Sequence, residues 1–225
     1  MYSIAGNLRE VHERIAASAT RSGRDPSGIK LVAVSKGRPL KMIIEAAQAG
    51  QSVFGENKAQ ELRDKLEAID RELEWHFIGH LQRNKVNMVV GNVAAIHSLD
   101  SESLAEAIHR RASFLGVEQD VLIQVNVSGE ESKYGVEEDR VGLLIDRVLS
   151  LSSLKLRGMM TIAPLLPAEE TRPFFKRLRE IRDAMSLRYP QEDLATLSMG
   201  MTQDFEIAIE EGANLVRIGT AIFSE

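Results

Sequence analysis

The sequence predicts an α/β fold: a single (β/α)8 barrel domain over residues 1–225, with one additional helix before the first strand. Three observations predict it. Eight short apolar runs alternate with amphipathic segments along the chain, which is the order that builds a parallel sheet. The runs are largely apolar, as expected for strands buried on both faces. Polar residues and glycines gather directly after the runs, on the face where a barrel carries its functional groups.

The predicted strands are short runs rich in β-branched residues. They lie at residues 31–34, 53–54, 76–78, 94–97, 121–127, 154–159, 195–197 and 215–218. An open, doubly wound sheet is the alternative, since the number of strands alone does not prove that the sheet closes. No G-x-G-x-x-G motif follows the first run, so the sequence gives no support to a dinucleotide-binding fold.

The predicted helices fill the gaps between these runs, each with apolar residues at spacings of three and four. Leu8, Val11 and Ile15 mark the additional first helix. The others are marked by Ile43, Ile44 and Ala47; by Leu62, Leu66 and Ile69; by residues 84–90; by Leu104, Ala107, Ile108 and Leu115 after a Ser101 cap; by Val141, Leu144, Ile145 and Val148; by Phe174, Leu178, Ile181 and Met185; and by Phe205, Ala208 and Ile209 after a Thr202 cap.

Composition excludes several classes of function. The 225 residues carry a formal net charge of −5, which argues against a nucleic-acid or anionic-membrane surface. The chain has no cysteine, so disulfides, thiolate metal sites and cysteine nucleophiles are excluded, and its 5 histidines lack metal-ligand spacing. We expect no metal. The first residues lack the apolar run of a signal peptide and no stretch is long enough to span a bilayer, so we expect a cytoplasmic protein.

Lys36 is the leading candidate for chemistry. It follows the first apolar run, so it should project from the end of the first strand. A surrounding barrel wall would disfavour its charged form and make the amine a better nucleophile toward carbonyls. The alternative is a solvated lysine at a strand end.

The loops after the last two strands predict an anion site. Gly219 and Thr220 follow the eighth strand and offer backbone N–H groups and a hydroxyl, while Ser198, Met199 and Gly200 follow the seventh. Arg217 lies within the eighth strand and needs a partner if it is buried. A carboxylate such as Glu56 or Asp204 could neutralise it, or it could donate to a ring nitrogen of a ligand.

Polar side chains after three other strands are candidates for the mouth of the site: Asn57, His80 and Asn126. Asn57 could equally cap the following helix, and His80 could be a hydrogen-bonded structural residue.

Together these segments resemble a known family. LVAVSKGRP, FGENKAQEL, WHFIGHLQRNK, VLIQVNVSGEESKYGV, LRGMMTIAP, LSMGMTQDFEIAI and VRIGTAIF extend from about residue 31 to residue 223. They are similar to the pyridoxal-phosphate homeostasis protein family, also called YggS-like or proline-synthase co-transcribed. Its members are related in fold to the N-terminal domain of alanine racemase, a fold-type III pyridoxal-phosphate-dependent barrel.

The resemblance implies a binding site for pyridoxal 5'-phosphate. It implies a Schiff base on Lys36 and a phosphate held by Ser198, Gly219 and Thr220, assisted by the Gly200 backbone. It places Arg217 against the pyridine nitrogen and Asn57, His80 and Met199 around the ring. Where some relatives carry a second lysine, this chain has Arg38, which cannot form an imine.

The function implied is intracellular homeostasis of pyridoxal phosphate, as a carrier or regulator with little or no catalysis. A permanently charged arginine disfavours protonation of the pyridine nitrogen, which weakens carbanion stabilisation. We expect a monomer that makes at most transient contact with pyridoxal-phosphate-dependent enzymes.

Two other functions are weighed against this one. An amino-acid racemase needs an acid and a base on opposite faces of the substrate carbon, and only Lys36 is convincingly placed, while Tyr134 is a candidate for an upper loop. A class I aldolase would also combine a lysine with a phosphate site, but would take a phosphorylated sugar and show no colour.

Overall fold

The computed structural model describes residues 3–130 and 133–224, and in these ranges the chain forms a closed barrel of parallel strands. The strands are β1 (Lys30–Val34), β2 (Val53–Glu56), β3 (Glu74–Phe77), β4 (Ala95–Leu99), β5 (Gln119–Gln124), β6 (Leu154–Met160), β7 (Thr196–Ser198) and β8 (Leu215–Ile218). β8 pairs with β1 in a register from Leu215 opposite Lys30 to Ile218 opposite Ala33. This pairing closes the sheet, so the predicted barrel is confirmed and the open sheet is excluded.

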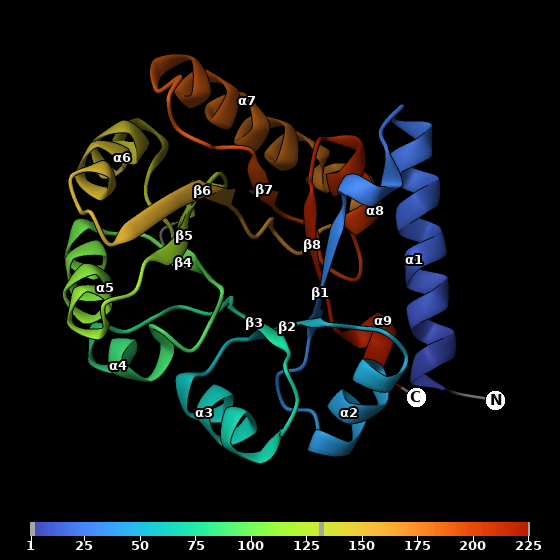
Figure 1. Cartoon of the computed structure of the whole chain (residues 1–225). Helices are drawn as coiled ribbons and strands as arrows, with labels where there is room; N and C mark the ends of the chain where they lie inside the picture. The colour runs from blue at the N-terminus through green and yellow to red at the C-terminus, as the bar shows by residue number, and fades with distance from the viewer. Residues whose placement is uncertain (1–2, 131–132, 225) are drawn as a thin grey trace.

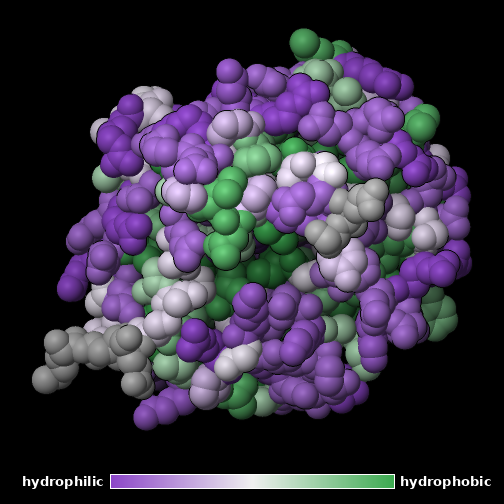
Figure 2. Space-filling view, turned by 180° about the vertical axis from the view of Figure 1, so that it is seen from behind, coloured by the Kyte–Doolittle hydropathy of each residue, from purple (hydrophilic) through white to green (hydrophobic). Residues whose placement is uncertain are grey.

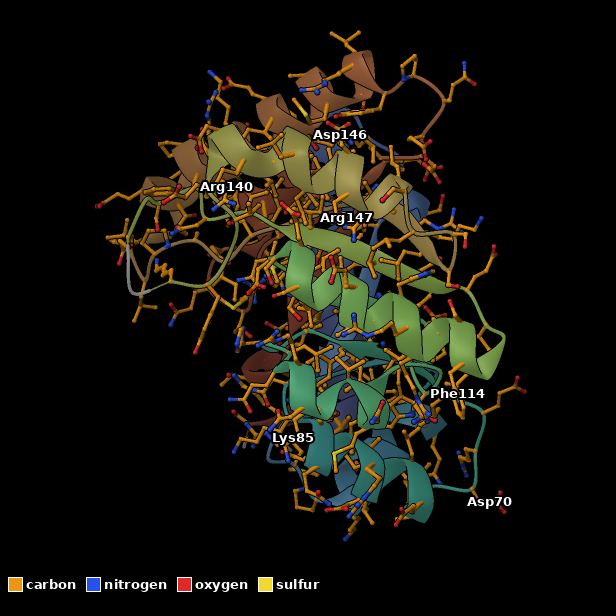
Figure 3. All side chains as sticks on the ribbon, turned by 90° about the vertical axis from the view of Figure 1, so that its left-hand side faces the viewer. Asp70, Lys85, Phe114, Arg140, Asp146 and Arg147 are labelled. Carbon is orange, nitrogen blue, oxygen red and sulfur yellow. The ribbon has the colours of Figure 1, made fainter. Side chains whose placement is uncertain are left out.

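Helices surround the barrel on its outside (Figure 1). They are α1 (Ile4–Arg21), α2 (Leu40–Gln48), α3 (Ala59–Ala68), α4 (Val86–Val89), α5 (Glu102–Leu115), α6 (Val141–Leu149), α7 (Arg172–Arg188), α8 (Phe205–Glu210) and α9 (Thr220–Phe223). α5 and α6 lie side by side, and Arg147 of α6 pairs there with Glu106 of α5 at an N–O distance of 2.7 Å (Figure 3). Exposed pairs of this kind contribute at most about 1 kcal/mol, so packing holds the helices in place.

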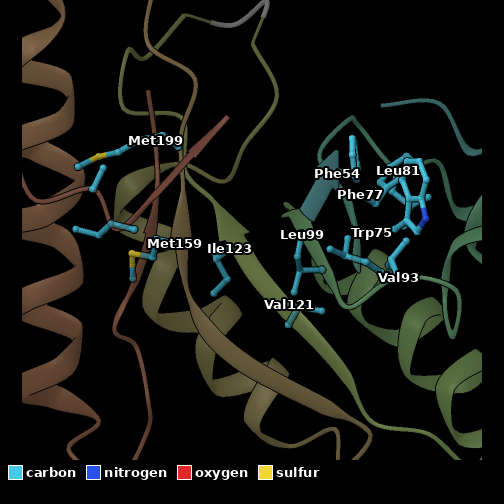
Figure 4. Close-up of a cluster of buried hydrophobic side chains, with 14 of the residues drawn as sticks. Phe54, Trp75, Phe77, Leu81, Val93, Leu99, Val121, Ile123, Met159 and Met199 are labelled. Atoms are coloured by element: carbon cyan, nitrogen blue, oxygen red, sulfur yellow. The ribbon is translucent and has the colours of Figure 1, made fainter. Parts of the chain in front are cut away.

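The core lies between the strands and the helices. Phe54, Trp75 and Phe77 are buried on neighbouring strands, and the Phe54 and Trp75 ring centroids are 5.6 Å apart (Figure 4). Burying each such side chain stabilises the fold by about 1.5–3 kcal/mol relative to exposure. The strands are apolar because one set of their side chains fills this layer while the other fills the barrel interior.

The predicted additional helix is α1, and it packs on the last elements of the barrel. Its apolar residues Leu8, Val11 and Ile15 are buried, as their spacing predicts. Asn7 Nδ2 donates to the Ile222 carbonyl at 3.0 Å, and Arg14 pairs with Glu206. α1 therefore covers the seam where β8 meets β1 (Figure 1).

Some boundaries differ from the prediction. β2 continues to Glu56, so Asn57 follows a strand that ends in a buried carboxylate. The predicted cap Thr202 is wrong, because α8 begins after Asp204; Thr202 Oγ1 instead accepts from the Ala221 N–H at 3.5 Å. Among the helices in the described ranges, none is both long and apolar enough to cross a lipid bilayer.

Candidate functional site

A cavity of about 680 Å³ opens at the carboxyl ends of the strands. Figure 2 shows this face of the molecule, with a central hollow that has hydrophobic surface on its floor and along part of its rim. Six of the predicted site residues line the cavity, namely Lys36, Asn57, His80, Arg217, Gly219 and Thr220. The barrel therefore brings together side chains that lie up to 184 positions apart in the sequence, counted from Lys36 to Thr220.

Lys36 lies two residues beyond the end of β1 and lines the cavity. Its side chain is exposed, which differs from the expected enclosure by the barrel wall, because Lys36 lies in the turn that follows β1 rather than in the strand. Within the described ranges Lys36 forms no ion pair. Its amine is therefore open to a ligand in the cavity.

A buried ion pair fixes the backbone that carries Lys36. Lys65 of α3 pairs with Glu56 and also donates to the Ser35 carbonyl at 2.7 Å. Ser35 Oγ donates to Glu56 Oε1 at 2.6 Å. Burial raises the pKa of the Glu56 carboxyl, and the hydrogen bonds from Lys65 and Ser35 oppose that rise. This cluster joins the ends of β1 and β2, directly before Lys36 and Asn57.

Arg217 enters the barrel interior from β8 and also lines the cavity. Its guanidinium donates to Ser198 Oγ at 2.6 Å and to the Thr161 carbonyl at 2.9 Å. In the described part of the chain neither Glu56 nor Asp204 contacts it as an ion pair, so both partners are uncharged. Burial lowers the pKa of Arg217 to about 10, and the nearby Asp204 opposes this change. The side chain thus stays a cation at neutral pH.

The loop after β8 has the features of an anion site. The backbone N–H groups of Gly219 and Thr220 donate to no acceptor in residues 3–130 and 133–224. A Cβ on Gly219 would lie 3.1 Å from the Val34 carbonyl oxygen, so a side chain there would press on β1. Glycine lets this loop run close to the strand end and keeps the N–H groups accessible.

Three predicted residues lie outside the cavity lining. Ser198 is buried in the barrel, where it accepts from Arg217 and contacts His97 Nδ1 at 3.0 Å. Met199 packs in the hydrophobic core (Figure 4). Gly200 is buried against Phe205 and Ala208 of α8. The loop after β7 instead reaches the cavity through Met201, Thr202, Gln203 and Asp204.

His80 and Asn57 line the cavity from the loops after β3 and β2. The His80 ring stacks on Tyr134, with centroids 3.9 Å apart, and its Nδ1 lies 3.3 Å from Asp100 Oδ2. Asn57 Oδ1 is buried and has no hydrogen-bond partner in the described ranges. Asn57 is not the residue that caps α3, because Lys58 holds that position. An unpaired buried carbonyl oxygen is costly, so Asn57 is well suited to accept from a ligand.

Several lining residues were not predicted from the sequence. Lys133 and Tyr134 reach the cavity from the loop after β5, and an apolar rim comes from the loop after β6, at residues 162–166. Asn126 was predicted for the mouth, but it is absent from the lining and donates to the Glu130 carbonyl at 2.9 Å. Tyr134 follows its strand by ten positions, beyond the immediate post-strand residues that the fold rule marks.

A second cavity of about 650 Å³ lies at the opposite end of the barrel, where Glu74 and His76 line it. His76 Nε2 lies 2.7 Å from Glu74 Oε1, and Lys30 Nζ lies 3.0 Å from the same oxygen. The hydrogen bond from His76, assisted by Lys30, lowers the pKa of Glu74 to about 2 from 4.5. In the described ranges no group of three or more acidic or histidine side chains could hold a metal ion.

This depressed pKa predicts how stability depends on acid. Folded Glu74 binds its proton more weakly than unfolded Glu74, so its stabilisation is present above pH 4.5 and is lost as the pH falls toward about 2. We expect Glu74→Gln to flatten the pH dependence of the free energy of unfolding in that window, measured by urea denaturation. The neighbouring exposed Glu72→Gln is the control, and it should leave the wild-type slope unchanged.

Comparison with known proteins decides the family. The family model for alanine racemase, N-terminal domain, matches residues 7–225. A pyridoxal phosphate homeostasis protein of Aquifex aeolicus (strain VF5) is 49% identical over 220 residues, which cover 97% of this chain and 96% of that protein. The chain belongs to the pyridoxal phosphate homeostasis protein family.

Other members of the pyridoxal phosphate homeostasis protein family are also similar over nearly their full lengths. The protein of Escherichia coli (strain K12) is 42% identical over 229 residues, covering 99% of this chain and 97% of its own. The structure of PipY of Synechococcus elongatus PCC7942 with PLP bound is 37% identical, with a TM-score of 0.84, and covers 95% of this chain and 100% of PipY.

The alanine racemase of Corynebacterium glutamicum, at 16% identity and a TM-score of 0.66, shares the fold alone and matches 96% of this chain and 61% of the racemase.

Proposed function

We propose that this chain binds pyridoxal 5'-phosphate in the cavity at the carboxyl ends of its strands, with Lys36 as the covalent attachment point. Its function is intracellular pyridoxal phosphate homeostasis, as carrier or regulator. One observation carries the proposal: a lysine amine, a buried arginine and a loop with unpaired N–H groups converge on one cavity. These are the groups that an aldehyde, a pyridine nitrogen and a phosphate each require.

The residues fit this cofactor on the geometry of the cavity. Gly219 and Thr220 would hold the phosphate through their backbone N–H groups. Arg217 would donate to the pyridine nitrogen, because its two contacts to Ser198 and Thr161 leave further guanidinium N–H groups on the cavity side. Asn57 Oδ1 supplies an acceptor, and His80 stacked on Tyr134 supplies a flat wall. Ser198, Met199 and Gly200 support this arrangement from behind, with Ser198 bound to Arg217.

Pyridoxal phosphate supplies an aldehyde that a lysine amine can bind covalently and an aromatic ring that can withdraw electrons. Lys36 would hold the cofactor covalently through its amine at the aldehyde carbon, with the carbonyl oxygen released as water. Arg217, which stays charged at neutral pH, keeps a proton off the pyridine nitrogen and so weakens electron withdrawal. This favours storage and delivery of the cofactor with little or no catalysis.

The remaining parts of the proposal concern where the protein acts and with what. We place it in the cytoplasm as a monomer, in transient contact with enzymes that use the cofactor. The apolar rim residues Ile162, Leu165 and Leu166 line the cavity and are exposed to solvent, which supports exchange of a bound cofactor without unfolding of the barrel.

The test is the visible absorption spectrum of the protein with added pyridoxal phosphate. We expect wild type to develop a visible band that borohydride abolishes, and Lys36→Ala to lose it completely, because the other lysine that lines the described cavity, Lys133, lies nine residues beyond the end of β5. The matched control is Lys41→Ala on exposed α2, which should keep the full band.

Three outcomes would contradict parts of the proposal. Absence of the band in wild type with excess cofactor would reject cofactor binding and favour an aldolase that takes phosphorylated sugars. An undiminished band in Lys36→Ala would move the attachment to another amine, with Lys133 next to be replaced. Rapid interconversion of alanine enantiomers by the loaded protein would reject the non-catalytic role in favour of a racemase.

A further inference from the structure

A continuous line of hydrogen bonds crosses the barrel interior from one cavity to the other. His76 Nε2 lies 2.7 Å from Glu74, His76 Nδ1 lies 2.8 Å from His97 Nε2, and His97 Nδ1 lies 3.0 Å from Ser198 Oγ. Arg217 completes it with its 2.6 Å bond to Ser198. We call these residues of β3, β4, β7 and β8 the interior network. Its Glu74 end lies in the 650 Å³ cavity and its Arg217 end in the 680 Å³ cavity.

Chemistry fixes the direction of the first bonds. An arginine guanidinium can only donate, so Ser198 Oγ must accept from Arg217. A hydroxyl has one proton to donate, and among the described residues the other hydrogen-bond partner of Ser198 Oγ is His97 Nδ1, so the proton is directed there. His97 Nδ1 therefore carries no proton.

The same reasoning continues to the far end. A neutral imidazole without a proton on Nδ1 carries it on Nε2, so His97 Nε2–H donates to His76 Nδ1. His76 in turn carries its proton on Nε2 and donates to the Glu74 carboxylate. Every bond of the interior network runs from Arg217 toward Glu74, and each member has the partner it requires.

The surroundings favour this arrangement over a protonated one. His97 is completely buried, and a second proton would put a cation beside Arg217 and in the field of Lys30. Burial is the main reason that the pKa of His97 lies well below its usual range, and the positive charges of Arg217 and Lys30 add to it. Two acids line the cavity beside the histidines: Glu74 accepts from His76, and Asp120 pairs with Arg157. Among the described residues, neither histidine bonds to another carboxylate.

We propose that His97, with His76 and Ser198, acts as a positioning residue that holds the Arg217 guanidinium at the cofactor cavity, and that Glu74 at the opposite end of the barrel fixes the direction of the whole network. The hydrogen-bond network itself does not depend on the proposed function. Only the statement that Arg217 is held in place for a cofactor rests on it. The Thr161 carbonyl accepts from the second guanidinium nitrogen, and with this single bond alone the guanidinium of Arg217 would be free to pivot. Ser198, locked by His97, supplies the second fixed point.

The first test needs neither substitution nor cofactor. Nitrogen-15 NMR of histidine-labelled wild type should show His97 as a neutral ring with its proton on Nε2 from neutral pH down to mildly acidic pH. Near neutral pH it should show His76 with its proton on Nε2 and an Nδ1 that accepts from His97. A proton on Nδ1 of either ring, or a charged His97 near neutral pH, would overturn the inference.

The second test asks whether the network positions Arg217. His97→Phe keeps the ring volume and removes both hydrogen bonds, and His109→Phe on the outside of α5 is the matched control. With nitrogen-15-labelled pyridoxal phosphate bound, the pH at which the pyridine nitrogen gains a proton should rise by about one unit or more in His97→Phe, because the cation that opposes protonation is displaced. It should not move in the control.

The outcomes separate the two proposals. An unchanged pyridine titration in folded His97→Phe would reject the positioning role. If His97→Phe does not fold, Ser198→Ala, which removes a single oxygen, should give the same rise. Failure of wild type to bind the cofactor would reject the proposed function, and the NMR test on cofactor-free protein would then decide the network by itself.

Discussion

Replacing Lys65 with methionine is expected to lower the free energy of unfolding by about 3–5 kcal/mol, because it leaves the Glu56 carboxylate buried without its cation. The Glu56 side chain is completely buried and that of Lys65 is 5% exposed, so water cannot replace the lost partner. Urea denaturation at neutral pH measures the loss. The control is Lys176→Met, which removes an exposed pair with Glu180 and should change stability by no more than about 0.5 kcal/mol.

The pH dependence of this loss has a definite sign. Without Lys65 the pKa of Glu56 rises further in the folded state. A raised carboxyl pKa gives stability that is present at low pH and lost as the pH rises, so the deficit of Lys65→Met should shrink in mild acid. Glu56→Gln combined with Lys65→Met should recover part of the stability at neutral pH. If Lys65→Met alone were as stable as wild type, the ion pair between Lys65 and Glu56 would contribute no net stability.

Replacing Gly158 with alanine is expected to destabilise the protein by at least about 3 kcal/mol, because the backbone and the neighbouring strand both oppose a side chain there. Its φ of +143° lies outside the range that alanine readily adopts, and a Cβ would lie 2.0 Å from the Thr196 carbonyl oxygen. Thr196 is its partner on β7, so the clash forces β6 and β7 apart.

The control for Gly158→Ala is Gly28→Ala, where a Cβ meets no atom within 4 Å. That change should leave the free energy of unfolding within about 0.5 kcal/mol of wild type. Thermal and urea denaturation of both variants measure the difference. Equal stability of Gly158→Ala and wild type would mean that β6 can shift without loss of the barrel.

The fold could be predicted because each strand and helix is indicated by a pattern among residues that are close in the sequence. An apolar run such as 215–218 and the spacing of Leu8, Val11 and Ile15 depend on near neighbours in sequence. The same rule located Lys36 and Gly219, since a strand end is visible in the sequence and the fold assigns it to one face. Closure of the barrel needed the pairing of β1 with β8, which no local pattern records.

The parts that were missed depend on contacts across the barrel. Glu56 was considered as a partner for Arg217, but Lys65, nine positions later on α3, takes it instead. The resemblance implied that Ser198 holds the phosphate, which stays a prediction; the sequence did not indicate that its hydroxyl lies between Arg217 and His97. Whether a strand-end side chain faces the cavity or the interior depends on where the strand stops, within one residue. Sequence patterns locate such ends less accurately than that.

The packing of α1 on α8 and α9 has a consequence for synthesis on the ribosome. Arg24 donates to the Ile209 and Ala213 carbonyls at 2.7 Å, and β1 finds its second neighbour only in β8, more than 180 positions later. While the nascent chain is still growing, the apolar face of α1 and one edge of β1 have nothing to pack against. Exposed apolar surface and unpaired strand edges promote aggregation, so chaperone protection during translation should matter most for this first fifth of the polypeptide.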